Sequence, residues 1–214
     1  FNEAAKTGDT KAQLAIAMKY DTGDGVPQDT VEAARWYQAA AEAGNVEAQF
    51  ILGTMFENGE GLPQNTEQAT AWYLQAAEAG NLHSQFNLAT FYDQGIGVEQ
   101  SDTEALKWYK QAAEQGVAEA QCNLGSMYRL GRGGATDEVA AVEWFIKAAD
   151  QGLARAQYNL GEMHHKGHGV RVDELEAAQL YRAAAEQGHA VAAIRLAAMF
   201  DQGIGVPKDD TEAV

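Results

Sequence analysis

The chain has 214 residues, with 15 lysines and arginines against 31 aspartates and glutamates, and a formal net charge of −16. This charge argues against a nucleic-acid partner, because phosphate contacts need a basic face, and against docking on anionic lipid. The single cysteine cannot form an internal disulfide, and no apolar run approaches the roughly 18 residues of a spanning helix, so we expect no membrane insertion.

A spacing of 36 residues runs through the chain without an insertion. At this spacing, glycine recurs at Gly8, Gly44, Gly80, Gly116, Gly152 and Gly188, and tryptophan at Trp36, Trp72, Trp108 and Trp144. A fixed period indicates a repeat array, whose units bury their apolar faces only against their neighbours. We therefore predict a single domain over 1–214: a partial N-terminal helix at 1–8, repeats at approximately 9–44, 45–80, 81–116, 117–152 and 153–188, and a partial last repeat at 189–214.

Each repeat is predicted to contain two helices, as the second one illustrates. Four apolar residues at helical spacing predict its first helix: Ala48, Leu52, Met55 and Phe56. The Gly59–Pro63 stretch then ends this helix, because glycine tolerates positive φ and proline cannot continue the hydrogen-bond ladder. A second helix is predicted to run to Ala79 and to stop at Gly80.

The second helix of every repeat begins with a residue type that caps helices. These N-cap residues are Asp29, Asn65, Ser101, Asp137, Asp173 and Asp209. Three residues later stand Glu32, Gln68, Glu104, Glu176 and Glu212, which predict a capping box in each case. Ala140 takes this place in the fourth repeat, so we expect its second helix to begin less firmly.

An apolar stripe along the second helix predicts the core. In the second repeat it comprises Ala69, Trp72, Tyr73, Ala76 and Ala77. Small residues let helix backbones approach closely, and the aromatic pair fills the space beside them. Their helical phase favours core packing over a role in stacking on sugars or bases.

The full pattern resembles the Sel1-like repeat family, which is related to the tetratricopeptide repeats. In the fourth repeat it comprises residues 120–128 (AQCNLGSMY), Gly131, Gly133 and residues 141–152 (AVEWFIKAADQG). The resemblance covers essentially the whole chain and implies an all-α, right-handed α/α superhelical solenoid with a concave face. It also implies an adaptor or scaffold role, in a family that is common in bacteria and often exported.

The variable positions of the first helix predict where a partner binds. The positions equivalent to 47, 51, 54 and 58 vary between repeats and lie along one face of the helix. The resemblance places this helix on the concave side, so we expect the groove to be formed by Asn87, Thr90, Gln94, Glu119, Asn123, Ser126, Arg155, Asn159, Glu162 and Arg195.

Two features of this groove have alternative interpretations. Asn87, Asn123 and Asn159 form a ladder that could clamp an extended peptide backbone, or could bond across the repeat interfaces instead. Arg155 and Arg195 could hold a carboxylate if they share the groove, or could make weak surface ion pairs.

Other chemistry is weakly indicated. His164, His165 and His168 could bind a metal, but His164 takes the place of an aromatic core residue in the other repeats, so we expect no metal site and no cofactor. Cys122 takes the place of apolar residues and is expected to be a small buried hydrophobe. The serines lack the lysine of the serine-lactamase signature, and no phosphate-binding loop is present.

We therefore predict a non-enzymatic scaffold that binds a protein or peptide partner through the concave groove. The alternatives are an immunity or inhibitor protein that masks a toxin or enzyme and, less favoured, a cell-wall or β-lactam hydrolase. The family resemblance favours a periplasmic or secreted location over the cytoplasm, although no signal peptide is evident. The ends of the array resemble no polar cap, so we expect a monomer, or weak self-association through these ends.

Overall fold

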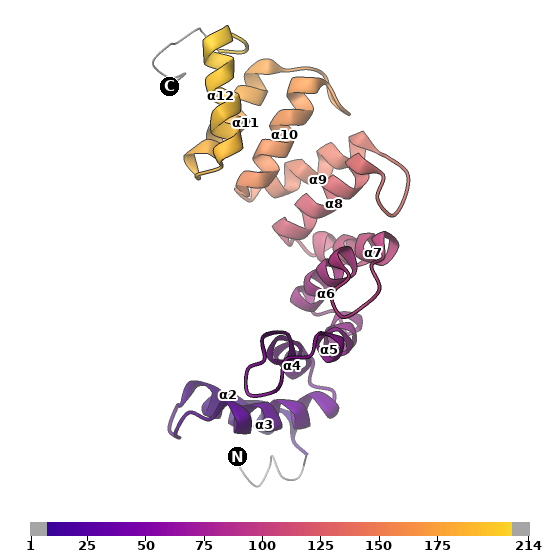
Figure 1. Ribbon diagram of the computed structural model, residues 1–214, viewed down its shortest axis with the longest axis vertical. Coiled ribbons are helices and arrows are strands. Elements are labelled where there is room, and N and C mark those ends of the chain that lie inside the picture. The colour runs from indigo at the N-terminus through magenta and orange to yellow at the C-terminus, as the bar shows by residue number, and fades with distance from the viewer. Residues whose placement is uncertain (1–7, 207–214) are drawn as a thin grey trace. The chain divides into compact units, whose positions relative to one another are not determined.

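The computed structural model describes residues 8–206 and confirms an α/α solenoid (Figure 1). Within this range the regular structure consists of eleven helices of 13 residues and no strand. The first helices of the repeats are α2 (Thr10–Thr22), α4 (Val46–Asn58), α6 (Leu82–Gln94), α8 (Ala118–Leu130), α10 (Ala154–Lys166) and α12 (Ala190–Gln202). The second helices are α3 (Thr30–Glu42), α5 (Thr66–Glu78), α7 (Asp102–Glu114), α9 (Glu138–Asp150) and α11 (Glu174–Glu186). No helix in this range is long and apolar enough to cross a membrane.

Contacts divide the chain into two units, Phe1–Trp108 and Tyr109–Val214, with the boundary inside α7. In the first unit α2 packs on α3, α4 packs on α5, and each second helix packs on the next first helix. In the second unit α8 packs on α9 and α10 on α11, and the same stacking joins α9 to α10 and α11 to α12. The apolar stripes of α3, α4, α5, α9, α10 and α11 are therefore covered both within their repeat and by a neighbouring repeat.

The Gly-x-Gly loop both ends a helix and brings two repeats into contact. Gly59 follows α4 with a φ of 76°, and its N–H bonds to the carbonyl of Met55. Gly61 has a φ of 68°, and a Cβ added there would lie 2.2 Å from the carbonyl oxygen of Thr30. The second glycine is therefore required by the close approach of the loop to the start of α3 in the preceding repeat.

The predicted N-caps form, but the capping box does not. Asp29 accepts hydrogen bonds from the N–H groups of Val31 and Glu32. However, the N–H of Asp29 donates to the carbonyl of Tyr20 on α2, and the Glu32 carboxylate accepts the indole N–H of Trp36 at 3.1 Å. The tight connection between the two helices thus supplies the bond that a capping box would otherwise make.

The same carbonyl bond recurs at Asn65, Ser101, Asp137 and Asp173. Asp137 also accepts the N–H of Ala140 at 2.9 Å, so α9 begins as the other second helices do, and the expected weaker start is not seen. Asp209, Glu212, Phe1 and Val214 lie outside the described residues.

The aromatic core is made mainly by the second residue of each aromatic pair. These rings are at most 2% exposed, and they are Tyr37, Tyr73, Tyr109, Phe145 and Tyr181. The preceding tryptophans are less uniform, because Trp108 is 3% exposed whereas Trp36, Trp72 and Trp144 are only half-buried. Trp36, Trp72 and Trp144 therefore lie at the margin of the core, and Lys147 stacks over Trp144 at 3.8 Å from the ring centroid.

Caps at the first helices differ between repeats in a way that we did not predict. Asn45 and Asn81 cap α4 and α6 through their side chains. Val117 and Leu153 take the same place before α8 and α10, with closely similar backbone angles and no side-chain cap. The backbone is therefore held in its cap geometry by packing, independently of the cap bond.

Candidate functional site

A cavity of about 310 Å³ lies among the first helices of the second unit. We call the surface that these helices form the first-helix face. The cavity is lined by Arg129, Tyr158, Asn159, Glu162, Met163, Lys166, His168 and Arg195. These residues come from α8, α10 and α12, three successive first helices, and from the loop that follows α10. The cavity brings together three residues of the predicted groove, Asn159, Glu162 and Arg195.

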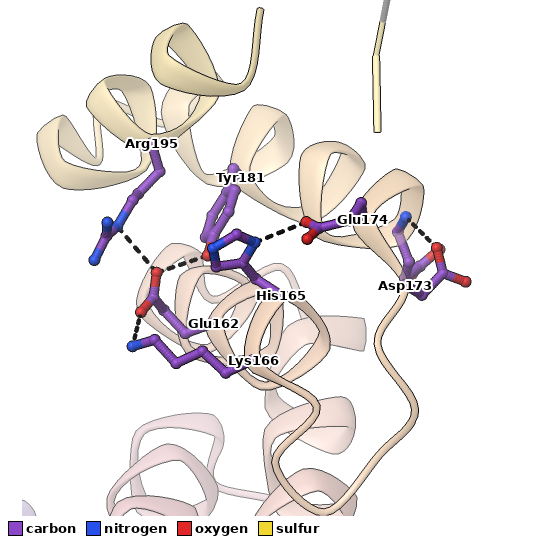
Figure 2. A network of polar contacts seen from close by, with 8 residues as sticks. Glu162, His165, Lys166, Asp173, Glu174, Tyr181 and Arg195 are labelled. Carbon is purple, nitrogen blue, oxygen red and sulfur yellow. Dashed lines mark hydrogen bonds and ion pairs between the residues drawn. The ribbon is translucent and has the colours of Figure 1, made fainter. Parts of the chain in front are cut away.

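Glu162, which lines this cavity, is the centre of the polar network that Figure 2 shows. Its Oε1 accepts the Tyr181 hydroxyl at 2.6 Å and lies 3.1 Å from Nε of Arg195, and its Oε2 accepts Nζ of Lys166. The network thus joins α10, α11 and α12 through one carboxylate.

The charges around Glu162 keep it ionised. Burial alone would raise the pKa of the Glu162 carboxyl, but the hydrogen bonds from Lys166 and Tyr181, with the charges of Lys166 and Arg195, lower it below its ordinary value. In return, the charge of Glu162, together with a hydrogen bond with the Tyr158 hydroxyl, raises the pKa of Arg195. This carboxylate therefore fixes two cations at the rim of the cavity.

The position of Glu162 departs from the pattern of the earlier repeats. In those repeats, an acid sixteen residues before the core tyrosine binds its hydroxyl: Asp21 binds Tyr37, and Glu57 binds Tyr73. In the fifth repeat that place is held by His165, whose Nδ1 lies 2.7 Å from Glu174 on α11 (Figure 2). Glu162, one helical turn earlier, accepts the hydrogen bond from the Tyr181 hydroxyl instead, and Glu162 also lines the cavity.

The fourth repeat departs from this pattern at both members of the pair. Arg129 replaces the acid, and Phe145 replaces the tyrosine, so no hydroxyl needs an acceptor. Arg129 lines the cavity and forms no ion pair with any residue in the described range. The predicted groove did not include Arg129, Tyr158 or Lys166; the sixteen-residue spacing would have singled out Arg129.

The asparagine ladder has partners across the repeats. Asn123 accepts the Arg155 guanidinium at 2.7 Å, and the Asn159 amide lies 3.6 Å from the sulfur of Cys122. In the first unit, Asn87 acts on the Tyr73 hydroxyl of the preceding repeat: burial raises the pKa of this hydroxyl, and Asn87 lowers it by a smaller amount. Each amide is half-buried, so the side chains are held by a neighbouring repeat while part of each stays open to solvent.

Arg155 and Arg195 do not share the cavity. Arg155 binds Asn123 and is absent from the cavity lining, whereas Arg195 binds Glu162. The two arginines therefore do not meet in this cavity, where the cations that accompany Arg195 are Arg129 on α8 and Lys166 on α10.

The remaining groove residues lie along the same helices. Thr90 and Ser126 are half-buried and donate to carbonyls of their own helices, those of Phe86 and Cys122. Glu119 is exposed on α8, one turn before Asn123, and Gln94 is exposed at the end of α6 in the first unit. These side chains border the first-helix face without joining the Glu162 network.

The three histidines do not converge. His165 contacts Glu174, His168 lies 3.6 Å from Glu138, and Nδ1 of His164 is buried without a partner in the described structure. In residues 8–206, no group of three His, Cys, Asp or Glu side chains is arranged to hold a metal ion. Cys122 is fully buried, as expected, and burial raises the pKa of its thiol.

Comparison with known proteins shows similarity to Sel1 repeat proteins along the chain. The family model described as Sel1 repeat matches residues 10–45, 46–81, 82–117, 118–153, 154–189 and 190–214. A protective antigen of uropathogenic Escherichia coli strains, with an SLR fold, is 39% identical at a TM-score of 0.91 over 99% of this chain. A Sel1 repeat protein from Oxalobacter formigenes is 33% identical at a TM-score of 0.83, also over 99% of this chain.

These matches differ in how much of each relative they cover. The chain spans 45% of the length of the Escherichia coli antigen and 84% of the Oxalobacter protein. An immunity protein from Pseudomonas aeruginosa is 19% identical at a TM-score of 0.50, and the match covers 95% of this chain and 78% of the immunity protein. At this identity, the similarity shows a shared fold alone. A search of the curated proteins gave no match.

Proposed function

Because the chain belongs to the Sel1 repeat family, we propose that it is a non-enzymatic scaffold that binds a protein or peptide partner on its first-helix face. The family favours protein–protein interaction. The observation that carries the assignment of the surface is the cavity to which α8, α10 and α12 all contribute. We propose that 1–214 acts as one array, whose binding surface continues from this cavity over Asn123 and Arg155.

The cavity suits recognition better than catalysis. A general acid or base works best when its pKa lies near the working pH, whereas the pKa of Glu162 is lowered by Lys166, Tyr181 and Arg195. Asn159 offers a donor and an acceptor for a peptide group beside these charges. The side chains are thus arranged to bind polar groups rather than to exchange protons with them.

Partner capture with matched variants tests this proposal. The chain carrying Asn123→Ala and Asn159→Ala would serve as bait beside the wild type, with captured proteins quantified by mass spectrometry. A control with Gln75→Ala and Gln179→Ala removes two exposed amides from second helices. We expect the first pair to reduce capture of a specific partner several-fold and the control pair to leave it unchanged.

Thermal unfolding separates binding from folding in this experiment. The amide of Asn159 has only a long contact to sulfur, and Arg155, the partner of Asn123, is exposed, so the double variant should keep its melting temperature within a few degrees. A large fall in the melting temperature would assign the ladder a structural role. Equal loss of capture in the control pair would show that capture does not depend specifically on Asn123 and Asn159. Either result would contradict the proposal.

The immunity or inhibitor alternative would use the same surface. Association with a basic toxin or enzyme would be favoured by the net charge of −16. If the captured partner is an enzyme whose activity falls when the chain is added, this alternative replaces the scaffold assignment. A partner that keeps its activity in the complex favours the scaffold.

A further inference from the structure

The cavity is basic although the chain as a whole is acidic. Arg129, Lys166 and Arg195 line it from three successive first helices, whereas Glu162 is the one acidic side chain among its lining residues. The cations therefore outnumber the anion, which is the reverse of the whole-chain balance of 15 to 31. A partner group that enters this cavity meets a local positive field inside a negative molecule.

Arg129 is free to bind such a group. In the two earlier repeats described above, an acid at the equivalent place is bonded to the core tyrosine, and the tyrosine is replaced here by Phe145. The guanidinium is exposed and forms no ion pair with the described residues. A guanidinium carries five N–H donors in a planar fork that matches a carboxylate.

Arg195 is held in place and still has donors to offer. Glu162 forms an ion pair with its Nε at 3.1 Å, so the N–H groups on the two terminal nitrogens can donate to a ligand. Because Glu162 also holds Lys166, the two cations on this side of the cavity are fixed before any ligand arrives. Such preorganisation reduces the entropy lost on binding.

We propose that this cavity binds a carboxylate of the partner, with Arg129 and Arg195 as the principal donors. The inference rests on the proposed function and names the chemical group that the binding surface recognises. Asn159 lies in the same cavity and can hydrogen-bond the adjoining peptide group, while Tyr158 and Met163 form its apolar wall. Glu162 opposes a more highly charged phosphate group, which favours the singly charged carboxylate.

Nuclear magnetic resonance titrations of the 214-residue chain at constant ionic strength test this assignment. N-acetylglycine represents a chain terminus, the α-amide of N-acetylaspartate represents an acidic side chain, and N-acetylglycinamide is the uncharged control. We expect saturable shifts of the Arg129 and Arg195 Nε–H signals with at least one of the two acids, and none with the amide. The acid that binds more tightly identifies the source of the carboxylate.

Variants locate the bound probe. Arg129→Met should raise the dissociation constant of the better acid about tenfold, and Arg129→Lys should raise it less, because it keeps the charge and loses the fork. Arg171→Met removes the same charge from an exposed loop position outside the cavity lining and should change it less than twofold.

Three results would overturn the proposal: equal shifts with N-acetylglycinamide, an equal effect of Arg129→Met and Arg171→Met, or tighter binding of inorganic phosphate than of either acid. Partner capture keeps this failure apart from failure of the proposed function. If capture depends on Asn123 and Asn159 and is unchanged by Arg129→Met, the surface is correct and the carboxylate assignment is wrong.

Discussion

The hydroxyl of Tyr181 donates a 2.6 Å hydrogen bond to Glu162, which lies nineteen residues earlier in the chain. The equivalent tyrosines Tyr37 and Tyr73 bond to acids sixteen residues earlier. The difference of three residues is close to one helical turn, so the acceptor moves along the same face of the first helix. In the fifth repeat, the acceptor of this recurring hydrogen bond is therefore also a lining residue of the cavity.

Removing the hydroxyl of this bond should weaken the fold without disrupting it. We expect Tyr181→Phe to lower the free energy of unfolding by about 1 kcal/mol, because Glu162 keeps Lys166 and Arg195 as partners. Phe145 already fills the equivalent core position and is fully buried, so phenylalanine fits. Urea unfolding measures the change, and Tyr37→Phe, whose bond to Asp21 is longer at 3.3 Å, should lose less. An equal or greater loss in Tyr37→Phe would contradict this account.

The Glu162 network should make the stability of the fold depend on pH. Because the pKa of Glu162 is lowered in the folded chain, its contribution is full above the ordinary value of about 4.5 and is lost as the pH falls through the lower folded value. We therefore expect the difference in melting temperature between the wild type and Glu162→Gln to be largest near neutral pH and to shrink below about pH 4.

The double variant with Arg195→Met provides the control for this pH dependence. Arg195 is one of the charges that lower the pKa of Glu162, so the pH-dependent part of the Glu162→Gln effect should be smaller in that background. An effect that is unchanged by Arg195→Met would show that the ion pair seen at 3.1 Å does not contribute.

The fold could be predicted because its signals recur in every repeat. Gly59 and Gly80 each have a counterpart 36 residues away on both sides, and the helices before them end at Asn58 and Glu78, within one residue of the predicted stops. The capping box was predicted wrongly because the sequence does not show that the N–H of Asp29 is already bonded to Tyr20 on the neighbouring helix.

The candidate site was harder to predict because it depends on departures from the repeat. The first-helix face was chosen from positional variability, and the cavity there includes Asn159, Glu162 and Arg195. Arg129 was missed, since its availability depends on the loss of a hydroxyl at Phe145 on the next helix. Arg155 and Arg195 were both placed in the groove from positional variability, which does not reveal the hydrogen bond between Arg155 and Asn123.

The second glycine of the loop should be intolerant of a side chain where a preceding repeat touches it. Gly25 and Gly61 have φ angles of 75° and 68°, so alanine at either costs about 1–2 kcal/mol in backbone strain. At Gly25 a Cβ meets no described atom within 4 Å, whereas at Gly61 it would lie 2.2 Å from the Thr30 carbonyl oxygen. We expect Gly61→Ala to lose about 1–3 kcal/mol more than Gly25→Ala in urea unfolding. Equal losses would show that the loop moves away from the Thr30 carbonyl oxygen without a measurable cost in stability.

The uncapped first helices offer a way to stabilise the array. Val117 has φ and ψ of −68° and 112°, and the capping residue Asn81 has −67° and 113°, so asparagine fits at Val117 without a change of backbone. We expect Val117→Asn to bond the N–H of Ala120 and to raise the free energy of unfolding by up to about 1 kcal/mol, less the apolar contact that the half-buried valine loses.

Two further variants distinguish the cap bond from packing. Asn81→Val removes the bond to the N–H of Ser84 at 2.8 Å and should lower the free energy of unfolding by about 1 kcal/mol. Leu153→Asn gains the same cap as Val117→Asn but removes a side chain that packs against the core around Phe145, so it should be destabilising. If Val117→Asn and Leu153→Asn change stability alike, the cap bond is not what separates these positions.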